Sequence, residues 1–125
     1  MQNTVGAMTL FVADKRRAKE FYGRVFELEP LFEDDTSVAF RFENTLVNLV
    51  VEHNVAELIA PATVGAGTRA LYTIWVDDCD ATVALVRGRG VDFPNGPVDR
   101  PWGQRTAVFV DPDGHAWEIA QALPS

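Results

Sequence analysis

The chain has little cysteine and no long apolar or basic run. Cys79 is the single cysteine, which excludes an internal disulfide framework and a thiolate metal cluster. It lies between Asp78 and Asp80, whose charges disfavour a thiolate, so a nucleophilic cysteine is not indicated. No stretch of about 18 consecutive apolar residues occurs, and the N-terminus lacks a cationic segment followed by an apolar one. We therefore expect a cytoplasmic protein that neither inserts into a membrane nor is exported.

Basic residues are also in the minority. The 125 residues include 11 Lys and Arg against 18 Asp and Glu, which gives a formal net charge of -7 and a pI near 4.7. No Lys- or Arg-rich run could follow a phosphate backbone, so we expect no nucleic-acid partner. The acidic surplus fits ordinary solubility, and its functional interpretation is attraction of cationic ligands. The length fits one domain.

The chain contains an internal repeat. Each copy begins with an apolar strand that ends in an aspartate able to cap the next helix, which predicts helices over 15–26 and 81–87, the second capped by Asp78 or Asp80. A shift of 64 residues pairs Thr9 with Thr73, Leu10 with Ile74, Phe11 with Trp75, Val12 with Val76 and Asp14 with Asp78.

Three short strand-like runs follow each helix. We therefore predict an α+β fold of two βαβββ modules, about 5–53 and 69–122, joined by a linker over 54–68 in which 56–60 can form a helical turn. The runs lie at roughly 28–33, 37–42 and 46–53, and at 92–98, 105–110 and 115–121.

Alternation along the strands predicts which face carries the helices. One parity is apolar, as in Met8, Leu10 and Val12, and the other is mixed, as in Thr9 and Phe11. The apolar face suits the helices, so the modules should form a curved mixed sheet with a concave cup and with helices on the convex side. A half-polar cup suits a small molecule, and the other interpretation is a wet or dimer-covered face.

One turn directs a carboxylate toward this cup. Pro112-Asp113-Gly114 suits a hairpin reversal between strands ending at Val110 and beginning near Trp117. Glu118 then lies between Trp117 and Ile119, which suit the helix side. A carboxylate there needs a partner, a water-filled cleft or a metal ion.

These features resemble the vicinal oxygen chelate superfamily, also called the glyoxalase/bleomycin resistance/dioxygenase family. The resemblance covers nearly the whole chain and is specific for fold, whereas the family includes lyases, isomerases, transferases, dioxygenases and drug-binding proteins. The matching motifs are Val12-Ala13-Asp14 with Phe21-Tyr22, Trp75-Val76-Asp77-Asp78, Pro101-Trp102-Gly103 and the turn from Asp111 to Glu118.

The resemblance also implies where a metal would bind. In metal-dependent members, ligands come from four strand positions that correspond here to Ala7, Asn48, Leu71 and Glu118. Alanine and leucine donate nothing, and one amide with one carboxylate falls short of the three protein ligands usual at a catalytic metal. We therefore expect no metal site and no cofactor.

Three interpretations of Glu118 remain open. It can be structural, hydrogen-bonded to Asn48, Thr9 or Thr73 at a lost metal site. It can anchor the cation or donor group of a ligand. It can also be the catalytic residue, a general base whose pKa is raised by apolar surroundings such as Leu71 and Val50.

The aromatic residues favour a ligand that stacks. Trp75 faces the cup by parity, the resemblance places Trp102 at the cleft mouth, and core packing is the alternative for both. Arg105 can bind an anion or pair with a surface acid such as Asp99 or Asp111. The expected ligand-binding residues are Thr9, Phe11, Asn48, Thr73, Trp75, Trp102, Thr106, Val108 and Glu118.

Three functions compete. The leading hypothesis is a metal-free protein that binds an aromatic or cationic small molecule, such as an antibiotic. The alternative is a lyase, isomerase or dioxygenase that uses a divergent metal site or Glu118 as general base. A third is a dimerisation module whose cup is filled by its own side chains. The resemblance implies a homodimer in each case.

Overall fold

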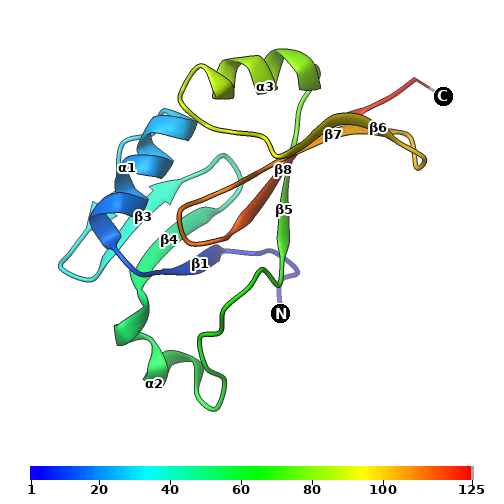
Figure 1. The fold of residues 1–125 in the computed structure, drawn as a ribbon. Coiled ribbons are helices and arrows are strands. Elements are labelled where there is room, and N and C mark those ends of the chain that lie inside the picture. Colours follow the sequence, from blue (N-terminus) through cyan, green and yellow to red (C-terminus); the bar gives the residue numbers. More distant parts are fainter. Residues whose placement is uncertain (125) are drawn as a thin grey trace. The chain divides into compact units, whose positions relative to one another are not determined.

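Two compact units make up the chain in the computed structural model, which describes residues 1–124. The first unit is Met1–Ala66 and the second begins at Gly67. Each contains a strand, a helix and three further strands in the same order (Figure 1). The predicted α+β class and the βαβββ plan are therefore confirmed.

The first module is a four-stranded sheet with one long helix. The strand order is β1-β4-β3-β2, in which β1 and β4 are parallel and the other pairs antiparallel. The elements are β1 (Ala7–Val12), α1 (Lys15–Phe26), β2 (Phe32–Glu33), β3 (Ser37–Arg41) and β4 (Leu46–Val51), followed by η1 (Glu52–Asn54) and α2 (Ala56–Ile59).

The second module repeats this topology. Its strand order is β5-β8-β7-β6, with β5 parallel to β8 and antiparallel pairing elsewhere. No helix among residues 1–124 has the length and apolar character needed to cross a membrane. The elements are β5 (Leu71–Trp75), α3 (Cys79–Arg87), β6 (Asn95–Arg100), β7 (Gln104–Val110) and β8 (Ala116–Ala122).

Local signals account for both long helices. α1 occupies the predicted range, and the Asp14 carboxylate accepts a hydrogen bond from the Arg17 amide at 3.1 Å. α3 begins at Cys79, two residues before its predicted start, because Asp78 rather than Asp80 is the cap and accepts from the Ala81 amide. The helical turn predicted within the linker is also present, as α2.

The apolar parity faces the helix in each module, as alternation predicted. In the second module Trp117 and Ile119 are buried with Phe109 on the side that α3 covers. The β6 strand begins later than predicted, because Val91 and Phe93 precede it as buried residues of an irregular segment. The Phe93 ring packs edge-on against Phe109, with centroids 5.5 Å apart.

The hairpin between β7 and β8 forms as the Pro-Asp-Gly sequence predicts. The buried Asp111 carboxylate accepts hydrogen bonds from the amides of Asp113 and His115, at 2.9 and 2.8 Å. Gly114 takes the positive φ of 91° that the reversal requires. The resulting register pairs Glu118 with Val108 on β7. On its other side β8 is parallel to β5, and Glu118 pairs there with Thr73.

A β-bulge near the start of β6 changes which residues share a face. Asn95 pairs with Val108 and Val98 pairs with Thr106, so β6 has one more residue than β7 between these pairs. Gly96 lies in the bulge with a φ of 88°. A Cβ there would lie 2.8 Å from the Ala107 Cα and closer still to the Thr106 carbonyl oxygen.

Gly96→Ala tests this close approach against a matched control. Gly103 has nearly the same φ, 89°, but nothing lies within 4 Å of the Cβ that it would gain. We expect Gly103→Ala to lower the free energy of unfolding by about 1–2 kcal/mol through backbone strain alone. Gly96→Ala should lower it by about 1–3 kcal/mol more, because of overpacking. Urea denaturation measures both, and equal losses would contradict the close approach.

Candidate functional site

The face of the second sheet that α3 does not cover gathers most of the expected site residues. We call it the helix-free face of the second module. Pairing across the strands puts Thr73, Glu118, Val108 and Asn95 in one row. The next row holds Trp75, Ala120, Thr106 and Val98, and Arg100 follows on β6.

Glu118 is half-buried on this face and hydrogen-bonded. The Thr73 hydroxyl donates to its Oε1 at 2.9 Å, which confirms Thr73 among the expected partners. No residue of 67–124 forms an ion pair with this carboxylate. Leu71 is 51 % exposed, so it provides no closed apolar pocket around Glu118. Glu118 is therefore a fixed acceptor with remaining lone pairs.

Arg100 was not identified from the sequence as a site residue. Its Nε donates to the Thr106 hydroxyl at 3.0 Å and its Nη2 donates to the Asn95 side-chain carbonyl at 2.8 Å. Simple alternation places residues 95 and 100 on opposite faces, and only the bulge brings them to one face. The sequence signal for this bulge is Gly96-Pro97, because a Gly-Pro pair inside the strand predicted at 92–98 indicates an irregularity.

Two of the three tryptophans are exposed. Trp75 and Trp102 are 62 % and 65 % exposed, whereas Trp117 is 2 % exposed and packs against Tyr72. Trp102 lies beside the helix-free face, because its Nε1 donates to the Gln104 Oε1 at 3.2 Å. The Arg100 guanidinium carbon lies 6.0 Å from the Trp102 ring centroid, within cation–π range.

Thr106 and Val108 are less accessible than the tryptophans. Thr106 is 0 % exposed, and its hydroxyl is occupied by Arg100. Val108 is half-buried between Asn95 and Glu118. Thr106 therefore holds the Arg100 side chain in position and has no exposed surface that a ligand could contact.

The expected residues of the first module lie on its own sheet. Thr9 on β1 pairs with Asn48 on β4, and Phe11 pairs with Val50. Asn48 and Phe11 are half-buried, and Thr9 is exposed. Within its module Asn48 holds the place that Glu118 holds in the second, opposite the repeated threonine.

The donor atoms at the family's metal-ligand positions do not fit a metal ion. Ala7 and Leu71 have no side-chain donor, and one Glu118 oxygen is already bound to Thr73. Among residues 1–124, no three or more His, Cys, Asp or Glu side chains group together in a way that could hold an ion. No catalytic step through a metal follows from this residue set.

Arg105 is neutralised, unlike Arg100. Its Nε donates to Asp80 and its Nη1 to Asp99, each at 2.9 Å. These hydrogen bonds raise the pKa of the Arg105 guanidinium above its ordinary value. Asp99 was an expected partner and Asp80 replaces Asp111, so the alternative of a surface ion pair is confirmed.

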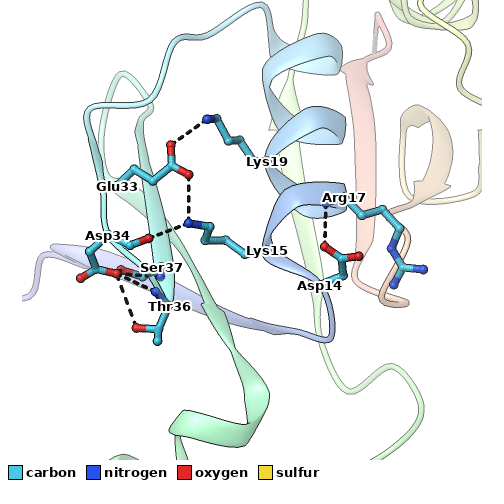
Figure 2. A network of polar contacts seen from close by, with 8 residues as sticks. All are labelled: Asp14, Lys15, Arg17, Lys19, Glu33, Asp34, Thr36 and Ser37. Carbon is cyan, nitrogen blue, oxygen red and sulfur yellow. Dashed lines mark hydrogen bonds and ion pairs between the residues drawn. The ribbon is translucent and has the colours of Figure 1, made fainter.

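A separate polar network joins α1 to β2 in the first module. Lys15 and Lys19 both pair with Glu33, at 3.0 and 2.7 Å, and lower the pKa of that carboxyl (Figure 2). Asp34 accepts from the amides of Thr36 and Ser37, which lowers its own pKa. These contacts join α1 to the β2 edge, and none of them involves an expected ligand-binding residue.

A groove of about 390 Å³ lies beside α1, away from the expected site residues. Several of its charges are paired, as Glu20 with Arg24 and Lys19 with Glu33. Its lining is mixed in sign and contains none of the predicted ligand-binding residues. The residues around it are Arg16, Lys19, Glu20, Gly23, Arg24, Leu28, Glu29, Pro30 and Phe40.

Comparison with known proteins identifies the family. The family model described as the Glyoxalase/Bleomycin resistance protein/Dioxygenase superfamily matches residues 4–119. No curated protein matches the chain.

Solved structures show the same fold. A glyoxalase/bleomycin resistance protein/dioxygenase from Nocardioides is 20 % identical over 100 % of this chain and 87 % of that chain, with a TM-score of 0.84. A glyoxalase-related enzyme from Fulvimarina pelagi is 21 % identical over 96 % and 88 %, with a TM-score of 0.83. Lactoylglutathione lyase from Agrobacterium tumefaciens is 21 % identical over 97 % and 95 %, with a TM-score of 0.74. At these identities the likeness establishes the fold alone.

The Cys79 thiol should be inert in the folded protein. It is fully buried, and burial together with the charge of Asp80 raises its pKa above the ordinary value. We expect reaction with 5,5′-dithiobis(2-nitrobenzoate) at pH 8 to be at least about 100-fold slower in buffer than in 6 M guanidinium chloride, because the thiol must first become exposed. Equal rates in the two solutions would contradict this burial.

Proposed function

Since the chain belongs to the glyoxalase/bleomycin resistance protein/dioxygenase superfamily, we propose that it is a member that binds a small aromatic or cationic molecule without a tightly held metal ion. The proposed binding surface is the helix-free face of the second module. An antibiotic, which the sequence analysis gave as an example of a ligand, would be such an aromatic or cationic molecule.

The observation that carries the proposal is the pairing of exposed indoles with a fixed carboxylate. Trp75 and Glu118 lie on neighbouring strands of one face, and Trp102 stands beside it. Exposed rings lose little conformational freedom when a planar ligand stacks on them. Glu118, held by Thr73, supplies an acceptor for a ligand donor or cation without having to reorient.

Binding without a metal is supported by the donor set. Glu118 is the single side chain with a strong donor among the four family ligand positions. General-base catalysis by Glu118 has weaker support, because the Thr73 hydroxyl is its hydrogen-bond partner and no second acid of residues 67–124 is hydrogen-bonded to it.

Tryptophan fluorescence tests the proposal. A panel of planar aromatic compounds, including 1-naphthylmethylamine as a cationic member, should quench the emission. Trp117→Phe should retain the ligand-induced change, because Trp117 is buried on the helix side. The Trp75→Phe/Trp102→Phe double variant should lose it. Circular dichroism controls for folding, and absence of quenching by every compound in folded protein would overturn the proposal.

Glu118→Gln should weaken the cationic member of the panel. A charge-assisted hydrogen bond is worth about 1.5–3 kcal/mol, so we expect the dissociation constant of 1-naphthylmethylamine to rise about tenfold or more. Glu43→Gln replaces an exposed carboxylate in the first module and serves as the control, which should leave this dissociation constant unchanged.

Metal analysis of the purified protein tests the enzyme alternative. One tightly bound ion per chain would favour that alternative.

A further inference from the structure

Two charged side chains of the helix-free face are held by neutral partners only. Arg100 is bound to the Thr106 hydroxyl and the Asn95 carbonyl, and Glu118 is bound to the Thr73 hydroxyl. No carboxylate among residues 67–124 forms an ion pair with Arg100. Each group is thus fixed in position while its charge stays uncompensated within the module.

The neighbouring Arg105 is held in a different way from Arg100. Arg105 lies opposite Asp99 in the β6–β7 pair and binds two carboxylates. Arg100 lies one residue further along β6, where alternation directs it to the other face. There the partners position a guanidinium without neutralising it, which leaves N–H donors in a planar fork available to an anion.

Aromatic surface adjoins both charges. The Trp102 ring lies 6.0 Å from the Arg100 guanidinium carbon, and Trp75 is adjacent to the Glu118 strand. Both rings are more than half exposed. A flat ligand that stacks on an indole therefore meets a cation at the β6 side and a carboxylate toward β5.

The register sets the scale of the separation. Asn95, which binds Arg100, is in the same row as Glu118 with Val108 between them. Because neighbouring strands lie about 4.8 Å apart, the backbones of Asn95 and Glu118 are about 10 Å apart, and the hydrogen bond to Asn95 brings the Arg100 guanidinium to the Asn95 end of this row. One or two aromatic rings bearing charged groups at opposite ends match this span.

We propose that the helix-free face of the second module selects a zwitterionic aromatic ligand, with its carboxylate or other anionic group at Arg100 and its ammonium group at Glu118. This inference rests on the proposed function and narrows its ligand class. A cation alone uses one anchor and leaves Arg100 unmatched, whereas the zwitterion uses both.

Matched probes test the inference. The zwitterions 4-(aminomethyl)benzoate and 4′-(aminomethyl)biphenyl-4-carboxylate are compared with benzylamine, a cation, and 4-methylbenzoate, an anion, by tryptophan fluorescence and NMR titration. At least one zwitterion should bind about tenfold or more tighter than either singly charged probe. Equal or tighter binding of benzylamine would overturn the inference and leave the proposed function standing. Absence of binding by all four would count against both.

Variants of the two arginines assign the effect. Arg100→Gln should raise the dissociation constants of the zwitterion and of 4-methylbenzoate about tenfold. The dissociation constant of benzylamine should stay the same or fall. Arg105→Gln is the matched control, because it removes a neighbouring arginine that is already neutralised, and it should leave the preference unchanged. The urea midpoint of each variant reports folding, and Arg100→Lys, which keeps the charge, should retain part of the preference. If Arg100→Gln weakened the binding of all probes to a similar extent, or weakened the binding of none, Arg100 would not be the site of the anionic group.

Discussion

The close approach of the β6 and β7 backbones at Gly96 is the constraint on which the second module's site depends. A side chain at this position would meet the Thr106 carbonyl oxygen and the Ala107 backbone, and the positive φ also favours glycine. The resulting bulge shifts the alternation of β6 by one residue. Asn95 and Arg100 consequently share a face with Glu118, and without the shift the guanidinium would lose one of its two neutral partners.

Arg100 and Arg105 are the same residue type on neighbouring strands, but they differ in their hydrogen-bond partners. Arg105 is committed to Asp80 and Asp99, an exposed arrangement that contributes little to stability and offers no charge to a ligand. Arg100 has a hydroxyl and an amide carbonyl instead, which limit its motion but preserve its charge. The same reasoning applies to Glu118, whose partner is the Thr73 hydroxyl.

The two modules share a plan but differ in the chemistry of equivalent positions. The repeated threonine faces Asn48 in the first module and Glu118 in the second. An amide can both donate and accept, whereas an ionised carboxylate accepts only, so this position can carry a negative charge in the second module and not in the first. The two modules thus share the register at this position and differ in the side chain that pairs with the threonine.

The sequence by itself determined the elements and the faces of most strands, because capping, turn chemistry and alternation are local. Asp14 and Asp78 mark both helix starts, and the Pro-Asp-Gly turn sets the register that places Glu118 opposite Val108. Only the tertiary structure decided the hydrogen-bond partners of Arg100. Its contacts depend on the bulge at Gly96, where two strands approach too closely for a side chain, and strand alternation alone assigns residues 95 and 100 to opposite faces.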